Sequence, residues 1–281
     1  MRAPDLRPLV PLHTRSSVVL AVTSLIGLVA FSWPLFTEPG SALDTSHSAD
    51  APWLFVLLLP LLAGVIFAEL SEGGIDAKAV AMLGMLAAVG AALRALGPGA
   101  AGLEPSFLVI LVGGRVFGRG FGFVLGALTI FSGGLLTGGI GPWLPFQMFG
   151  AGWMGFFAGC LPSARGRAEL VLLAAYGMVS GVLYGVLLNM WFWPFAAYGP
   201  EVTFVPGDSL AENMHRYLLF WATTSLGWDL PRGVLNAVMV LLVGGPVLAA
   251  LRRAARRAAF DVPMTFEPAD PATAASTDSR T

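Results

Sequence analysis

The residues of this chain that could do chemistry are polar side chains set beside long apolar segments. Asp229, Arg232 and Asn236 follow one another at spacings of three and four, which would put them on one face of a helix. Charged and amide groups in such surroundings are costly unless they bind a ligand or one another. The sequence therefore predicts a small-molecule site, and a mutual ion pair between Asp229 and Arg232 is the alternative. The polar residues predicted for the site are Arg94, Gln147, Tyr184, Asn189, Asp229, Arg232 and Asn236.

The glycine-rich stretch 133–159 adds aromatic residues to this set. We expect a helix to open at Pro142, because the N–H group that proline lacks would have no partner in the first turn of a helix. On such a helix Trp143 and Gln147, four residues apart, share one face. Several tryptophans would lie near the same level, either as walls of the site or as an interfacial belt. They are Trp143, Trp191, Trp193 and Trp228.

Motifs typical of catalysis do not occur in the sequence. It contains no Gly-x-Ser-x-Gly elbow, no His-Glu-x-x-His pair and no Walker A pattern, and His215, in the predicted surface helix, has no serine in a nucleophile context beside it. The single cysteine, Cys160, excludes an internal disulfide and has no metal-ligand spacing around it. We therefore expect no enzyme, metal or cofactor. A membrane enzyme and an accessory subunit without a ligand are the alternatives of another class.

Composition defines the class of protein. Of 281 residues, 56% are hydrophobic and only 12% are charged, and the apolar runs approach 20 residues. Continuous runs of this length indicate an all-α polytopic membrane protein, whereas a β-barrel would show alternation. The net charge of −1 gives no reason to expect nucleic acid as a partner.

The apolar runs predict eight spans. Gly118 and its neighbouring glycines favour a turn between two short spans, because one fused helix would place Arg115 and Arg119 near the middle of the membrane. Ser209 and Glu212 form a capping box for a surface helix that ends near Ser225. The predicted spans are 16–36, 53–70, 77–96, 104–116, 120–136, 142–161, 169–191 and 230–251. Residues 1–15 and 258–281 are expected to be cytoplasmic tails, the second of them disordered.

The arginines predict the orientation of these spans. With both termini in the cytoplasm, the inner side collects most of the arginines, and the outer side keeps only Arg94, Arg216 and Arg232. This distribution follows the positive-inside rule. The polar residues predicted for the site then lie together near the outer surface of a bacterial cytoplasmic membrane.

Small residues recur every four positions on the span 77–96. One stripe contains Gly84, Ala88 and Ala92, and a neighbouring stripe contains Ala87, Ala91 and Ala95. Small residues let helices approach closely within a bilayer. The sequence leaves open whether these stripes pack against helices of this chain or against a partner subunit.

Three segments resemble the S component, the substrate-binding subunit, of energy-coupling factor (ECF) transporters, with the cobalamin type most similar. They are GGRVFGRGFGFVLGALT at 113–129, GGIGPWLPFQMFGAGWMGFFAG at 138–159 and the run 225–257 that begins SLGWDLPRGVLNA. The likeness covers about residues 77–257. It implies a six-helix substrate-binding core, and residues 16–70 then form an additional pair of transmembrane helices.

The resemblance also implies partners and a ligand. A transmembrane coupling (T) subunit and two cytoplasmic ATPase subunits would energise uptake, and the small-residue stripes of the first core helix would dock on the coupling subunit. Loops 97–103, 133–141 and 194–209 would cover a vitamin bound at the outer side. Tryptophans and amides suit a large, flat molecule with polar edges, such as a corrinoid or a flavin. The family likeness favours cobalamin, with riboflavin or another vitamin as the alternative.

Overall fold

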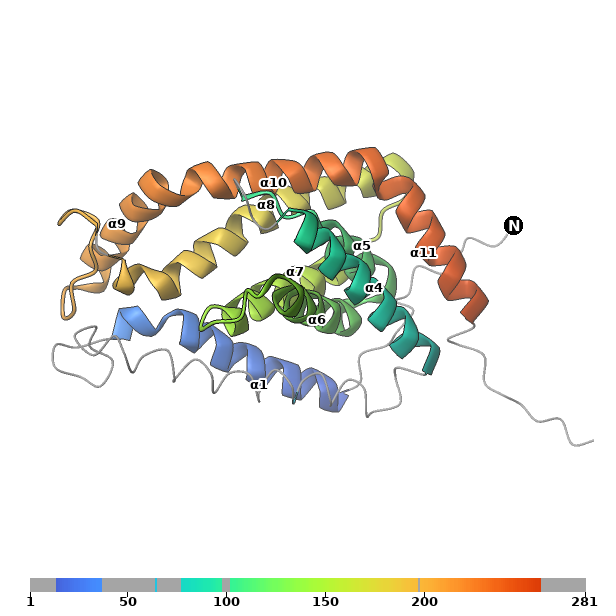
Figure 1. Cartoon of the computed structure of the whole chain (residues 1–281), viewed down its shortest axis with the longest axis horizontal. Helices are drawn as coiled ribbons and strands as arrows, with labels where there is room; N and C mark the ends of the chain where they lie inside the picture. Colours follow the sequence, from blue (N-terminus) through green and yellow to red (C-terminus); the bar gives the residue numbers. More distant parts are fainter. Residues whose placement is uncertain (1–13, 37–63, 65–76, 98–101, 197, 259–281) are drawn as a thin grey trace, which may run out of the picture.

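A computed structural model describes residues 14–36, 64, 77–97, 102–196 and 198–258 of the chain. These residues form helices and connecting turns, with no strand among them (Figure 1). The α-helices are α1 (Thr14–Phe31), α4 (Ala77–Leu96), α5 (Ser106–Phe117), α6 (Arg119–Thr137), α7 (Leu144–Cys160), α8 (Gly166–Phe192), α9 (Leu210–Phe220), α10 (Leu226–Met239) and α11 (Gly245–Ala258). Short 3₁₀ turns, η1 (Trp33–Phe36) and η4 (Trp193–Phe195), follow α1 and α8.

Four helical stretches are long and apolar enough to cross a membrane. They are Lys78–Leu96, Arg119–Thr137, Gly166–Phe195 and Leu210–Arg256, and two shorter apolar helices are Ser17–Phe31 and Ser106–Phe117. The predicted span 53–70 lies outside the described residues except for Gly64, as do residues 1–13 and 259–281 of the two predicted tails. The count of eight spans and the position of the termini stay predictions.

The expected turn between two short helices is confirmed at Gly118. Its φ of 106° lies in a region that side chains rarely adopt, and here α5 ends and α6 begins. Arg115 and Arg119 therefore lie at one end of the bundle and not in its middle.

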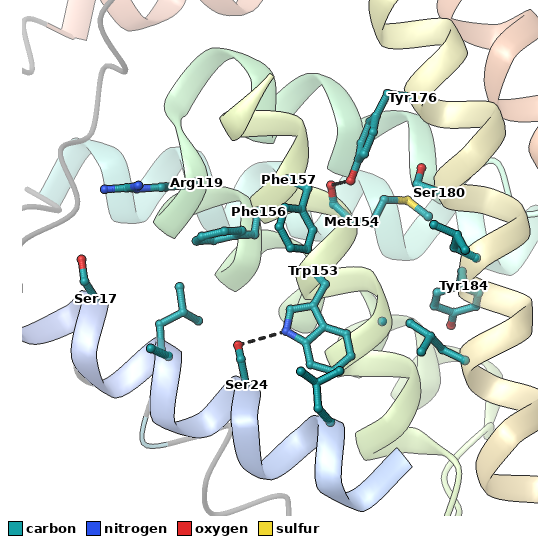
Figure 2. A pocket seen from close by; sticks show the side chains of 16 residues that line it. Ser17, Ser24, Arg119, Trp153, Met154, Phe156, Phe157, Tyr176, Ser180 and Tyr184 are labelled. Carbon is teal, nitrogen blue, oxygen red and sulfur yellow. Dashed lines mark hydrogen bonds between the residues drawn. The ribbon is translucent and has the colours of Figure 1, made fainter. Parts of the chain in front are cut away.

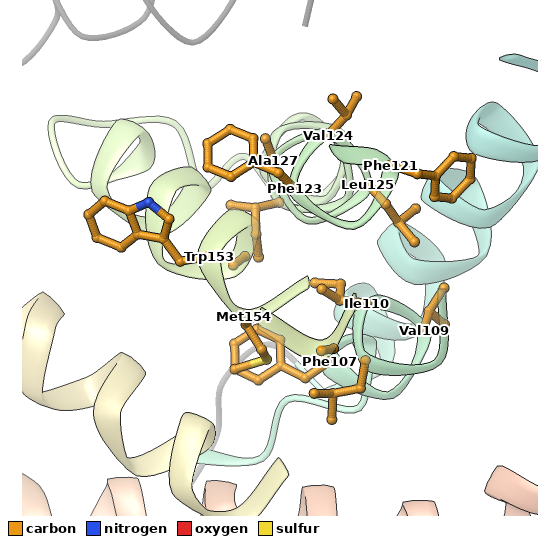
Figure 3. Close-up of a cluster of buried hydrophobic side chains, with 14 of the residues drawn as sticks. Phe107, Val109, Ile110, Phe121, Phe123, Val124, Leu125, Ala127, Trp153 and Met154 are labelled. Atoms are coloured by element: carbon orange, nitrogen blue, oxygen red, sulfur yellow. The ribbon is translucent and has the colours of Figure 1, made fainter. Parts of the chain in front are cut away.

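The centre of the bundle is the packing of α5, α6 and α7 (Figure 3). Phe107 and Ile110 of α5, Phe123 of α6 and Met154 of α7 are buried in this cluster. The backbones of α6 and α7 touch, since a Cβ added at Gly155 would lie 2.1 Å from the carbonyl oxygen of Gly122. Glycines at four-residue spacing thus allow close approach where lipid provides no hydrophobic drive.

The start of α7 corrects one sequence prediction. The helix begins at Leu144, with Pro145 in its first turn, so Pro142 belongs to the preceding turn. Pro145 occupies the helical position where the missing N–H is harmless. Trp143 becomes the residue that caps the helix, and it still lies one turn before Gln147.

The last part of the chain corrects a second prediction. The expected break between a surface helix and the final span near Ser225 is wrong, because residues Leu210–Arg256 form one continuous helical stretch. Two π-turns, Trp221–Ser225 and Val240–Gly244, absorb extra residues without ending the helix. The hydroxyl groups of Thr223 and Thr224 donate to carbonyls one turn earlier and satisfy backbone acceptors at the first π-turn. The capping box of Ser209 and Glu212 at the start of α9 is confirmed.

The end of the bundle that carries Arg115, here called the Arg115 end, is held by one buried carboxylate. Glu169 of α8 accepts from Arg115 Nε at 2.8 Å and from two nitrogens of Arg252 at 2.9 and 2.6 Å. Arg115 also donates to the carbonyls of Leu161 and Pro162, after α7. This cluster ties α5, α7, α8 and α11 together.

The opposite end, here called the Trp143 end, has a small core of its own. Trp193 is fully buried among Phe204, Tyr217 and Phe220, and its Nε1 donates to the carbonyl of Val202 at 2.6 Å. Asn213 of α9 bonds to both backbone groups of Val205. The connection between α8 and α9 is therefore packed onto α9, and among the described residues of the predicted covering loop 194–209, which leave out position 197, only Phe195 reaches the cavity described below.

Candidate functional site

A cavity of about 420 Å³ opens at the Trp143 end between α7 and α8. Four predicted site residues line this Trp143 cavity: Trp143 and Gln147 from the start of α7, and Asn189 and Trp191 from the end of α8. The other lining residues are Pro142, Leu188, Phe192 and Phe195. Its volume is in the range of small-molecule sites, and its walls are mostly apolar with two amides, as such sites require.

Gln147 is oriented by Arg94 from behind the cavity. Arg94 NH2, at the end of α4, donates to Gln147 Oε1 at 2.9 Å, and Arg94 NH1 lies 3.5 Å from Glu104 Oε1. Glu104 in turn accepts from the hydroxyl of Ser106 at 2.9 Å. Arg94 thus supports the site without lining it.

Asn189 is oriented by its own helix. Its Nδ2 donates to the carbonyl oxygen of Gly185 at 2.9 Å, one turn earlier in α8. The side chain is half-buried and its Oδ1 has no hydrogen-bond partner among the described residues. Gln147 Oε1 and Asn189 Nδ2 therefore form hydrogen bonds within the protein, which leaves Gln147 Nε2 and Asn189 Oδ1 available to a ligand in the cavity.

The aromatic walls are held in different ways. Trp191 is buried and stacks on Phe146, with ring centroids 4.7 Å apart and ring planes 3° from parallel. Trp143 is 43% exposed, and its Nε1 donates to the carbonyl of Gly139 at 3.2 Å. Its ring folds back over Gly141, where an added Cβ would lie 2.4 Å from the indole. The Trp191 wall is therefore fixed by stacking on Phe146, whereas the Trp143 ring packs against the glycine turn at Gly141.

Asp229, Arg232 and Asn236 do not line the Trp143 cavity. Asp229 is 2% exposed, pairs with Arg232 NH1 at 2.5 Å and accepts from Trp221 Nε1 at 2.8 Å. Asn236 is buried and donates to the carbonyl of Gly177 at 3.1 Å. Placing these residues in the ligand site is therefore not supported by their contacts, and the mutual ion pair is what the structure contains.

Close packing of α8 on α10 explains their burial. A Cβ added at Gly185 would lie 1.9 Å from Asp229 Oδ1, so the carboxylate fills the space where a side chain of α8 would be. In an apolar environment the charge needs a partner, and Arg232 supplies one. The sequence showed the spacing of these residues but could not show which helix they face.

Tyr184 and Trp228 also lie away from the Trp143 cavity. Tyr184 is buried beneath the guanidinium of Arg232, 5.5 Å from the ring centroid, within electrostatic reach of Arg94 and Glu104. Trp228 is 52% exposed and does not line the cavity. Sequence reasoning missed Phe192, Phe195 and Trp221; the aromatic run at 191–195 was the available signal for the first two.

A second cavity, here called the α1 cavity, lies between α1, α7 and α8 and has a volume of about 540 Å³ (Figure 2). Trp153 of α7 lines this cavity, and its Nε1 donates to the hydroxyl of Ser24 in α1 at 3.0 Å (Figure 2). Tyr176, Ser180 and Tyr184 approach it from α8. Most of its lining is apolar, and of the predicted site residues only Tyr184 reaches it. The α1 cavity is larger than the Trp143 cavity, but its polar side chains are not the residues that the sequence predicts for the site, apart from Tyr184.

The two small-residue stripes of α4 differ in burial. Ala87 and Ala91 are buried in the bundle, so they are taken up by packing within this chain, whereas Ala95 at the end of the same stripe is exposed. Gly84, Ala88 and Ala92 are all exposed, and a Cβ added at Gly84 would meet nothing within 4 Å. The stripe of Gly84, Ala88 and Ala92 is therefore the candidate docking face.

The Trp143 cavity contains groups that can bind a small molecule. Within the described residues, no group of three or more His, Cys, Asp or Glu side chains could hold a metal ion. The Trp143 cavity has amides to hydrogen-bond a ligand and aromatic rings to stack on it, with no nucleophile or general base among its described lining residues.

Comparison with known families gives one match. The model of the family described as "ECF transporter, substrate-specific component" matches residues 78–244, which begin in α4 and end at the second π-turn. Comparison with curated proteins and with solved structures finds no match. The family match covers more than half of the chain and contains both amides of the Trp143 cavity. This chain is therefore a multi-pass membrane protein that belongs to the family of substrate-specific components of ECF transporters.

Proposed function

We propose that this protein captures a vitamin at the outer side of a bacterial cytoplasmic membrane and that the Trp143 cavity is the binding site. The observation that carries the proposal is the meeting of Gln147 and Asn189, from two helices, in one cavity with aromatic walls. Substrate-specific components of ECF transporters work with a transmembrane coupling subunit and ATPase subunits. For this chain we propose one coupling subunit and two ATPase subunits.

The orientation supports capture from outside. Most of the arginines in the described part of the chain lie at the Arg115 end, and Arg94, Arg216 and Arg232 belong to segments at or near the Trp143 end. By the positive-inside rule the Arg115 end faces the cytoplasm and the Trp143 end faces outward. The eight-span topology with two cytoplasmic termini is part of this proposal.

Cobalamin is the ligand that the family likeness favours, and riboflavin is the alternative. The size of the cavity bears on this choice, because about 420 Å³ suits a drug-sized ligand. A riboflavin ring system would fit within such a volume, whereas a corrinoid would insert only part of its periphery. Both molecules are flat and carry polar edges.

A binding assay tests the proposal. Full-length protein in lipid nanodiscs is incubated with labelled cyanocobalamin, riboflavin and other B vitamins, and retained ligand is measured by equilibrium dialysis. We expect saturable binding of one of them. Absence of binding across the whole panel would overturn the proposed function and favour an accessory subunit without a ligand.

A further inference from the structure

We infer that the Trp143 cavity selects an uncharged ligand edge on which a hydrogen-bond acceptor and a donor lie side by side, as in a carboxamide or a lactam. This inference rests on the proposed function and names the chemistry that the site recognises. It follows from the hydrogen bonds that orient Gln147 and Asn189, which leave the two amides with opposite roles.

Gln147 is the donor of the pair. A guanidinium can only donate, so the amide atom that faces Arg94 at 2.9 Å must be the carbonyl oxygen. The orientation of this amide is therefore determined by chemistry, even though its oxygen and nitrogen are nearly the same size. The Nε2 group, with two N–H donors, is left for the cavity.

Asn189 is the acceptor of the pair. The carbonyl oxygen of Gly185 can only accept, so the amide atom 2.9 Å from it must be Nδ2. The Oδ1 atom is then left for the cavity. A ligand that satisfies both amides needs an acceptor for Gln147 and a donor for Asn189.

The residues that line the Trp143 cavity disfavour a charged ligand. None of the eight described residues around the Trp143 cavity is charged. Arg94 does not line the cavity: its NH1 lies 3.5 Å from Glu104 Oε1 without a hydrogen bond and is buried, and only 12% of the side chain is exposed. A carboxylate in the cavity would therefore meet no cation among the lining residues, and its two oxygens would both be acceptors, one of them opposite Asn189 Oδ1. Burying such a charge without a partner is costly.

The aromatic residues of the cavity add a preference for a flat ligand. Trp191 is fixed against Phe146, while the exposed rings of Trp143 and Phe192 can contact a flat ligand face. A ring that carries an amide or lactam edge would contact these aromatics and hydrogen-bond to both amides. The carboxamides at the periphery of a corrinoid and the imide edge of a flavin both meet this description.

Nicotinamide and nicotinate are a matched probe pair, because they share one flat ring and differ only in a carboxamide or a carboxylate. Their binding to the full-length protein in nanodiscs is measured by saturation-transfer NMR, which detects weak binding of small molecules without a label. We expect nicotinamide to bind at least about tenfold more tightly than nicotinate, the usual effect of one unpaired polar group. Equal binding of the two probes would overturn the inference.

Two variants test the assigned roles. Gln147→Glu keeps an acceptor for Arg94 but removes the donor. Asn189→Ser keeps a hydroxyl donor for the Gly185 carbonyl but removes the amide oxygen, and the shorter side chain holds its own oxygen back against the helix. Each should weaken nicotinamide binding at least about tenfold. Glu201→Gln, the reverse exchange at an exposed loop position, is the control. If both variants bind nicotinamide as the wild type does while remaining folded, the donor and acceptor roles are wrong.

The vitamin panel separates this inference from the proposed function. A wild-type protein that binds a vitamin but does not distinguish nicotinamide from nicotinate would retain the function and lose the inference. A protein that distinguishes the two probes in the NMR experiment but shows no saturable retention of any vitamin, nicotinamide included, in equilibrium dialysis would retain the amide selectivity and lose the proposed function.

Discussion

At the scale of single residues, the polar side chains divide into those that hold the fold and those that face the cavity. Asp229 is 2% exposed and neutralises Arg232 inside the α8–α10 contact, whereas Gln147 and Asn189 are half-buried and open to the Trp143 cavity. The two groups should therefore respond differently to substitution. Residues of the first group should affect stability, and residues of the second should affect affinity.

Asp229→Asn should lower the free energy of unfolding by about 3 kcal/mol, because it removes the buried carboxylate that pairs with the largely covered guanidinium of Arg232, 15% exposed. Thermal and denaturant unfolding of the detergent-solubilised protein measure this change. Asp208→Asn is the matched control, since Asp208 pairs with Arg216 at 3.4 Å but about a third of its side chain is exposed. That exposed pair should contribute less than about 1 kcal/mol. Equal losses in the two variants would contradict the structural role of Asp229.

At the scale of elements, α4 presents one face to the bundle and one face outward. The outward face carries the stripe of Gly84, Ala88 and Ala92 between exposed apolar side chains such as Met85 and Val89. Small residues on a lipid-facing surface allow a partner helix to approach closely. This face is therefore the proposed contact with the coupling subunit.

Gly84→Leu and Ala88→Leu should reduce co-purification with the coupling subunit at least about tenfold, since a loss of about 1.4 kcal/mol at the contact has that effect. Vitamin binding should not change, because both positions are exposed and far along α4 from Arg94. Ala168→Leu, exposed in the first turn of α8, is the control for added bulk. Unchanged co-purification of both variants would refute the docking face.

Ala91→Leu should behave in the opposite way. Ala91 is 1% exposed within the bundle, so three additional carbon atoms have no room there. Overpacking of this kind costs about 1–3 kcal/mol, which thermal unfolding of the isolated protein would detect. Wild-type stability in this variant would show that the stripe of Ala87 and Ala91 is not tightly packed.

At the scale of the whole molecule, the two ends of the bundle differ in charge and in chemistry. The Arg115 end is tied by Glu169 and carries most of the arginines, whereas the Trp143 end carries the cavity and the aromatic cluster around Trp193. A long stretch from α9 to α11 runs across α8 and bends where α11 begins (Figure 1). If capture occurs from outside, the two ends must face opposite sides of the membrane.

The single cysteine allows this to be measured. Cys160 is exposed at the end of α7, next to the Arg115 end, so a membrane-impermeant maleimide should label it only in inside-out vesicles. A Glu201→Cys substitution in a Cys160→Ser background should be labelled only in right-side-out vesicles, because Glu201 is exposed near the Trp143 end. The reverse pattern would invert the proposed orientation and place the cavity in the cytoplasm.

Features that depend on neighbouring positions in the chain were predictable from the sequence. The break at Gly118, the capping box of Ser209 and Glu212, and the shared face of Trp143 and Gln147 follow from local spacing and from residue type. The likeness to S components was also visible, because it rests on runs of residues that are contiguous in the chain. Apolar length and glycine content determine where helices form, whatever those helices later touch.

Only the tertiary structure decided which partner each helix face meets. Spacing put Asp229 and Arg232 on one face, but the close approach of α10 to Gly185 turned that face into a buried contact. Likewise, the packing of α4 in the bundle buried Ala87 and exposed Gly84. The rotation of a helix about its axis and its distance from its neighbours depend on contacts between residues far apart in sequence. For that reason hydropathy and spacing can locate a polar residue along a helix, but only packing determines whether it faces a ligand, a partner or another side chain.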